Sequence, residues 1–178
     1  MSRKIIILFL ALLLSFAACN KKSSSTNTNT AKPNPDVKDP EGFTPLMNAI
    51  KNNDAEGAKR AVDNGGNVNA RSNYGVTALS TAAGMGNVEM VKYLIEKGAD
   101  VNNKADGNFT PLMQAALVGQ VEVIKILLDA GADPNAKDTR NQTAADWAEN
   151  RGHKEAAALL KQKMSPATVS TQEQAKKK

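Results

Sequence analysis

The stretch "GNFTPLMQAALVGQ", Gly107–Gln120, contains a start signal and a stop signal for one short helix. Thr110 precedes the apolar run, and a threonine side chain in that position accepts a hydrogen bond from a free backbone N–H of the first turn. Pro111 follows at the first helical position, where its missing N–H costs nothing. Gly119 comes eight residues after Pro111 and suits the left-handed conformation that ends helices. The stretch therefore predicts a capped helix between Thr110 and Gly119.

The same pattern recurs along the chain with a period of about 33 residues. The recurring threonines are Thr44, Thr77, Thr110 and Thr143, and Ala49, Ala82, Ala115 and Ala148 follow in the same register. A fixed period of this length is typical of stacked repeat units. Asn53, Gly86, Gly119 and Gly152 share the position at the end of the first helix, and asparagine tolerates the left-handed conformation best among the residues other than glycine.

Each unit also predicts a second helix. In "NVEMVKYLIEKG", Asn87–Gly98, the apolar residues Val88, Val91, Leu94 and Ile95 fall on one stripe at helical spacing. Gly98 then closes the helix, and an Asp/Asn-rich segment forms a turn. Gly65 and Gly131 occupy the same position in the neighbouring units.

A 33-residue period with Thr-Pro-Leu, a paired alanine and Gly-Ala-Asp-x-Asn resembles the ankyrin repeat. The resemblance implies an all-α solenoid of helix pairs joined by turn or hairpin tips. We expect full units at residues 39–71, 72–104 and 105–137, followed by a capping unit at 138–164. The capping unit lacks the proline and the leucine and is rich in alanine and charge, as an end that meets water should be.

The chain departs from the family at one recurrent position. Ankyrin repeats often carry histidine after Thr-Pro-Leu, whereas this chain has Met47, Ser80, Met113 and Asp146 there. We expect the cost to be small because the threonine caps remain. His153 stands where the family often places histidine at the start of the second helix, and we interpret it as a capping or packing residue.

The charge distribution argues against nucleic-acid binding, despite a pI of about 9.3. Residues 39–164 contain 14 Lys and Arg against 16 Asp and Glu, and the excess of positive charge lies in the two ends of the chain. Binding to nucleic acid requires clustered basic side chains that displace counterions. The repeat region has no such cluster.

The N-terminus is predicted to be a lipoprotein signal peptide, residues 1–18. Arg3 and Lys4 precede a largely apolar run, Ile5–Ala18, whose 14 residues are fewer than the roughly 20 that a membrane span needs. The end, Phe16–Cys19, resembles a bacterial lipobox, in which the cysteine receives lipid. Cys19 is then the attachment point. Ordinary cleavage after Ala17 and an uncleaved anchor remain as alternatives.

The segments that flank the repeats are predicted to be unfolded. Residues 19–38 form a lipid-attached linker of Ser, Thr, Asn, Lys and Pro, and residues 165–178 form a basic tail. Neither can bury enough apolar surface to fold. Together with the lipoprotein signal, the linker predicts a location in the bacterial cell envelope, where the lipid holds the protein on the outer membrane, facing the periplasm.

The sequence shows no grouping of residues for catalysis, for a metal or for another cofactor. One cysteine and one histidine cannot make a zinc site, and no phosphate-binding glycine loop is present. We therefore expect no enzymatic activity and no cofactor.

In the ankyrin family the partner surface consists of the turn tips and the exposed side of the first helices. The resemblance places that surface at matching positions of this chain: Phe43, Tyr74, Val76, Met85, Phe109, Leu117, Val118 and Arg140. Among all the matching positions, those of units two and three are largely apolar, whereas those of the end units include Glu41, Lys51 and Arg151, and an apolar centre with a polar rim is the anatomy of a protein interface. The alternative is that Leu117 and Val118 pack against a neighbouring unit, or that the tips bury Phe109. Trp147 is expected to pack against the third unit.

The resulting hypothesis is a non-enzymatic adaptor that binds one protein through the concave face of repeats two and three. We expect a monomer, because nothing in the chain implies self-pairing. An immunity protein that neutralises a toxin and a structural envelope lipoprotein without a specific partner are the alternatives. A hydrolase is a further alternative.

Overall fold

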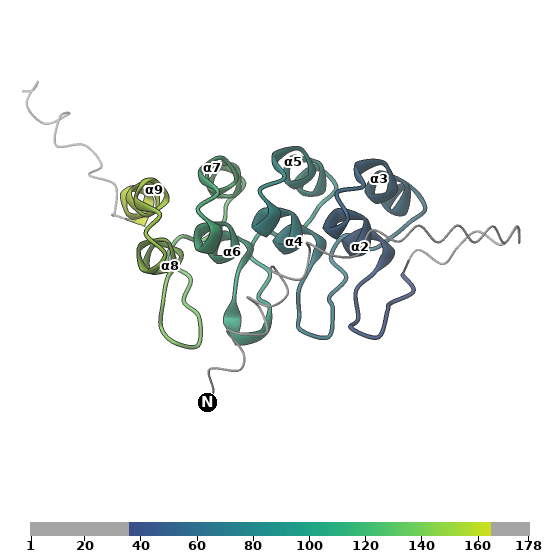
Figure 1. Ribbon diagram of the computed structural model, residues 1–178, viewed down its shortest axis with the longest axis horizontal. Helices are drawn as coiled ribbons and strands as arrows, with labels where there is room; N and C mark the ends of the chain where they lie inside the picture. The colour runs from purple at the N-terminus through teal and green to yellow at the C-terminus, as the bar shows by residue number, and fades with distance from the viewer. Residues whose placement is uncertain (1–35, 165–178) are drawn as a thin grey trace, which may run out of the picture. The chain divides into compact units, whose positions relative to one another are not determined.

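Residues 36–164 are described by the computed structural model of the chain, and they form helix pairs as predicted (Figure 1). The α-helices are α2 (Pro45–Lys51), α3 (Ala55–Asp63), α4 (Ala78–Met85), α5 (Val88–Glu96), α6 (Pro111–Val118), α7 (Val121–Asp129), α8 (Ala144–Asn150) and α9 (Lys154–Met164), and η2 (Asp106–Asn108) is a short 3-10 helix. No strand is assigned within these residues, so the all-α solenoid is confirmed. The predicted signal peptide, Cys19, most of the linker and the tail lie outside the described residues.

The predicted starts and ends of the first helices are confirmed. Each of the four recurring threonines caps its helix through its side-chain oxygen. At the other end Asn53 has φ 55°, and Gly86, Gly119 and Gly152 are likewise left-handed. Gly119 also needs its missing side chain, because a Cβ there would lie 2.5 Å from the Nδ1 atom of His153. The half-buried His153 thus packs against the third unit.

The histidine-free position after Thr-Pro-Leu is filled in two ways. Met47 and Met113 are fully buried in the core. Ser80 and Asp146 instead complete capping boxes, in which the serine hydroxyl accepts from the N–H of Thr77 at 2.9 Å and the Asp146 carboxylate accepts from the N–H of Thr143 at 2.8 Å. A capping box satisfies two free helix-end groups reciprocally, so this position still stabilises the helix starts.

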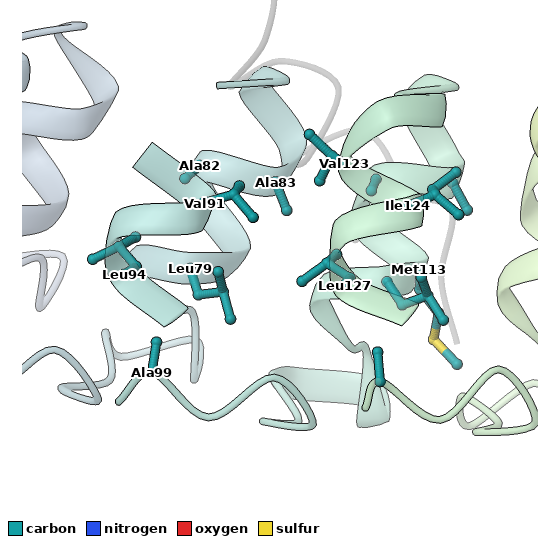
Figure 2. Packing of buried hydrophobic residues seen from close by; sticks show 14 of the residues in the cluster. Leu79, Ala82, Ala83, Val91, Leu94, Ala99, Met113, Val123, Ile124 and Leu127 are labelled. Carbon is teal, nitrogen blue, oxygen red and sulfur yellow. The ribbon is translucent and has the colours of Figure 1, made fainter. Parts of the chain in front are cut away.

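The helices form two layers, with α2, α4, α6 and α8 in one and α3, α5, α7 and α9 in the other (Figure 1). The core lies between the layers and between successive units. In Figure 2, Leu79, Ala83 and Val91 of the second unit face Leu127 and Val123 of the third. Each unit therefore buries its apolar side chains against its neighbour, which is why such stacks depend on contacts between units.

Asparagine side chains also connect the units along the turns. Asn102 donates from Nδ2 to the carbonyl of Gly131 at 3.0 Å, and its Oδ1 accepts from the N–H of Asp133 at 2.9 Å. Asn69, one period earlier, makes the same pair of bonds to Gly98 and Asp100 at 2.9 and 2.8 Å. The recurrent Asn of the turn segment is thus a bridge to the following unit.

The ordered stack begins before the first predicted unit. Asp36 lies one period before Asn69, and its Oδ1 accepts from the N–H of Asn67 at 2.9 Å, as Asn69 does from Asp100. Lys38 donates from Nζ to the carbonyl of Arg71 at 2.8 Å. Asp36 and Lys38, at the end of the predicted linker, therefore already contact the turn segment of the first unit.

The asparagine bridges make a testable contribution to stability. We expect Asn102→Ala to lower the free energy of unfolding by about 1–2 kcal/mol, because it removes two hydrogen bonds between units that contribute roughly 0.5–1.5 kcal/mol each. Asn135 provides the control, since it occupies the same position in the third unit but its side chain makes neither bond to the described residues of the capping unit. Asn135→Ala should change the stability by less than about 0.5 kcal/mol in urea unfolding. Equal effects of the two substitutions would contradict the bridging role.

Candidate functional site

One side of the first helices is left uncovered by the rest of the stack. On each of these helices the residues that face the second layer are buried, and the exposed or half-buried residues recur three and four positions apart. We call the inner face these helix positions together with the adjacent tip positions. Its helix positions are Asn48, Lys51, Asn52, Thr81, Gly84, Met85, Gln114, Leu117, Val118, Asn150 and Arg151, and its tip positions are Glu41, Tyr74, Val76, Asp106, Gly107, Phe109, Thr139, Arg140 and Gln142.

The tips hold their positions through a backbone ladder from unit to unit. The N–H of Asn73 donates to the carbonyl of Glu41, that of Asp106 to Tyr74, and that of Thr139 to Gly107, at 3.2, 3.0 and 2.9 Å. Backbone hydrogen bonds of this kind fix the spacing of the side chains that the tips carry. The inner face is therefore a preformed surface.

Apolar side chains occupy this surface in units two and three. Tyr74 and Met85 are each 41% exposed, a high value for large hydrophobic residues. Leu117 and Val118 are half-buried on α6, and Val76 is half-buried at the tip. The structure thus brings five of the predicted contact residues onto one face, and each retains surface that a partner can reach.

Phe43 is a correction to the predicted contact set. Its ring is only 4% exposed and belongs to the core cluster. The Lys51 ammonium lies 4.0 Å from the ring centroid and covers it further. Phe43 therefore stabilises the first unit and offers no surface to a partner, although it shares its position in the repeat with Val76 and Phe109.

Phe109 is held between the surface and the core. Its ring meets the ring of Trp147 edge to face, with centroids 5.2 Å apart and an interplanar angle of 84°. Phe109 is half-buried, and Trp147, on α8, is 9% exposed. The prediction that Trp147 packs against the third unit is confirmed. The alternative that the tips bury Phe109 is confirmed in part, because the contact with Trp147 covers some of the ring and the rest stays exposed.

Arg140 lies on the inner face of the capping unit and is fixed from two sides. Its guanidinium carbon is 4.4 Å from the centroid of the Trp147 ring, and its Nε is 3.6 Å from the Oδ2 atom of Asp138. Asp138 is buried and also accepts from the indole N–H of Trp147 at 3.2 Å. Asp138 is not among the residues that the sequence predicted for this face. The signal was available, because Asp39 lies three periods earlier at the same position.

The carboxylates of Asp39 and Asp146 have lowered pKa values, and both stabilise turns or helix ends. Hydrogen bonding from the Asn48 side chain, and then from the N–H groups of Phe43 and Glu41, holds the pKa of Asp39 below its usual value. The N–H and hydroxyl of Thr143, together with the charges of Lys161 and Lys137, lower the pKa of Asp146. Both groups stay ionised to serve caps and turns, and neither has the raised pKa of a general acid.

The described part of the chain offers neither a metal site nor a membrane span. There, no group of three or more His, Cys, Asp and Glu side chains could hold a metal ion. Between residues 36 and 164 every helix is too short or too polar to cross a bilayer. The inner face is the feature of this region that points to a function.

Comparison with known protein families agrees with the fold. A family model described as ankyrin repeats (3 copies) matches residues 14–105, and a second one described as ankyrin repeats (many copies) matches residues 94–148. The two matches overlap and together extend into α8. No curated protein matches the chain.

Proposed function

The chain belongs to the ankyrin-repeat family, whose stacks are generally non-enzymatic modules for protein–protein interaction, and we propose that it is a lipid-anchored adaptor in the bacterial cell envelope. In this proposal the inner face of units two and three binds one protein partner. The lipid on Cys19 holds the repeat domain at the membrane, on the periplasmic side of the outer membrane.

The observation that carries the proposal is the exposure of Tyr74 and Met85 beside Leu117 and Val118. Scattered exposed apolar residues are common, but a contiguous group marks an interaction site. Tyrosine supplies large contact area at low entropic cost, and methionine adapts to irregular partners. Polar residues of units one and four border the group, as the rim of an interface does.

A triple variant tests the binding surface. We expect Tyr74→Ala, Met85→Ala and Val118→Ala together to weaken partner binding about 100-fold or more, because losing roughly 1 kcal/mol at each of three contact residues gives about 3 kcal/mol. All three side chains are exposed or half-buried, so the thermal melt should stay close to that of the wild type. The measurement is affinity purification from the native cells with quantitative mass spectrometry.

Val37→Ala is the matched control for the triple variant. Val37 is 60% exposed and apolar, but it precedes the first unit and lies outside the inner face. The proteins recovered with wild type should also be recovered with this variant. Undiminished recovery with the triple variant would show that the partner binds elsewhere.

The membrane anchor is tested separately. We expect Cys19→Ser to move the protein from the membrane fraction to the soluble fraction, because several acyl chains on Cys19 provide the firm anchoring. Mass spectrometry of the mature N-terminal peptide should show the added lipid in the wild type. Retention of Cys19→Ser in the membrane would indicate an uncleaved anchor, and a soluble wild type would indicate ordinary cleavage after Ala17.

A further inference from the structure

The inner face is electrically asymmetric along the stack. In unit one the exposed Glu41 offsets Lys51, and in the middle the single charge is that of Asp106. In the capping unit the charged inner-face residues are Arg140 and Arg151, and both are exposed. The apolar centre is therefore followed at one end by two cations.

Within residues 138–164, Asp138 is the one carboxylate that forms an ion pair with either of these arginines. Asp138 is buried beneath Arg140 and holds the tip together with Trp147. Asp146 serves the capping box of Thr143. Glu149 pairs with Lys161 of α9, on the side of α8 that faces away from the inner surface. Asp146 and Glu149 are thus engaged elsewhere, and the inner-face positions of the capping unit carry no acidic side chain, so the surface of this end presents positive charge.

Arg140 is arranged to receive an anion. The Trp147 ring supports one side of its guanidinium at 4.4 Å, and Asp138 orients the Nε edge at 3.6 Å. Its side chain is still 46% exposed. A guanidinium held in place loses less entropy on binding, and its planar fork matches a carboxylate in a bidentate geometry.

From this arrangement, and resting on the proposed function, we propose the chemistry of the bound segment. The inner face takes an extended stretch of the partner that places apolar side chains over units two and three and an Asp or Glu over unit four, where Arg140 and Arg151 bind the carboxylate. Packed helices lie about 8–10 Å apart, and an extended chain advances about 3.3 Å per residue. The recognised pattern is therefore two apolar residues and one acidic residue, each about three positions from the next.

Selection from a random 12-residue peptide library tests this pattern on the full-length chain in detergent. The wild type should enrich peptides with the apolar–apolar–acidic spacing. The double variant Arg140→Glu, Arg151→Glu should replace the acidic preference with Lys or Arg. For a selected synthetic peptide, the double variant should weaken binding about 10–100-fold, the range expected for hydrogen bonds to charged groups.

Two further variants keep the outcome interpretable. Arg151→Glu alone leaves the Arg140–Trp147–Asp138 contacts intact, and it should weaken the peptide about tenfold even if the double variant folds poorly. Lys154→Glu makes the same charge change on the exposed start of α9, outside the inner face, and should alter binding less than about twofold.

The possible failures separate the two proposals. Apolar peptides without an acidic preference, or an acidic preference unchanged by Arg151→Glu, would overturn the inference and leave the inner face as a binding surface. Selected peptides that bind the Tyr74, Met85 and Val118 triple variant with the same affinity as the wild type would overturn the proposed function. Binding of anionic vesicles by the Cys19→Ser chain through these arginines, with no acidic peptide enriched, would assign them to lipid headgroups and overturn the inference.

Discussion

Removal of residues 138–178 is expected to abolish cooperative thermal unfolding of the repeat domain. The truncation takes away α8 and α9, which pack against α6 and α7, and with them the buried Trp147 and Leu160. In Figure 2, Ile124 and Met113 extend from the third unit away from the second, toward the place of the removed helices. Both are fully buried in the intact chain.

The size of the effect follows from these side chains. Exposing a buried residue of this size costs about 1.5–3 kcal/mol, so Ile124, Met113 and Phe109 together cost roughly 4 kcal/mol or more. That is a large part of the 5–15 kcal/mol by which domains are usually stable. We expect a broad loss of helical signal in circular dichroism that begins about 15 °C or more below the midpoint of the intact chain.

A shorter truncation is the control for this experiment. Removal of residues 165–178 alone leaves every described buried side chain in place, since the last of them is Leu160. This chain should melt within a few degrees of the full-length protein. An unchanged melt after removal of residues 138–178 would contradict the model of a stack that needs its cap.

Trp147→Ala is expected to cause the largest loss of any single substitution in the capping unit. The change removes the edge-to-face contact with Phe109, the support for Arg140 and the hydrogen bond to Asp138. Truncating a buried aromatic residue to alanine typically costs about 3–5 kcal/mol. Urea unfolding should show this loss as a lower midpoint with a similar slope.

Trp147→Phe separates packing from hydrogen bonding. Phenylalanine keeps a ring against Phe109 and Arg140 but cannot donate to the buried Asp138 carboxylate. We expect a cost of about 1–2 kcal/mol, because Asp138 retains its bonds from the N–H groups of Arg140 and Gln142, both at 2.8 Å. If alanine and phenylalanine were equally tolerated, Trp147 would not be the link between unit three and the cap.

The sequence predicts the exposure of the contact residues in unit two correctly, but not that of the contact residue in unit one. Tyr74 and Met85 are exposed as the repeat pattern implies. Phe43 is not, although its position in the repeat equals that of Val76. A repeat alignment assigns one environment to equivalent positions, whereas the first unit closes around a phenylalanine ring that Lys51 covers. Burial at this position depends on the neighbours of each copy, which the period does not specify.

The start of the stack shows the same limit. Residues 36–38 read as linker because they are polar and contain little to bury. Their role depends on the Asp36 carboxylate reaching the N–H of Asn67 and on Lys38 reaching the carbonyl of Arg71. These two contacts join residues that are separated by 31 and by 33 positions, and contacts at such separations leave no local pattern of hydrophobicity.

The sequence by itself determined the helix pairs, their caps and their stacking, because each of these depends on local backbone chemistry repeated at a constant interval. Threonine, proline, glycine and Asn53 mark the helix ends through their own conformational preferences, whatever surrounds them. Only the tertiary structure decided which side chains of the inner face remain exposed, that Asp138 joins Trp147 and Arg140 in one cluster, and that Ser80 and Asp146 complete the caps. These outcomes depend on the shapes and charges of residues that packing brings together. The spacing of those residues along the chain does not specify which of them will meet.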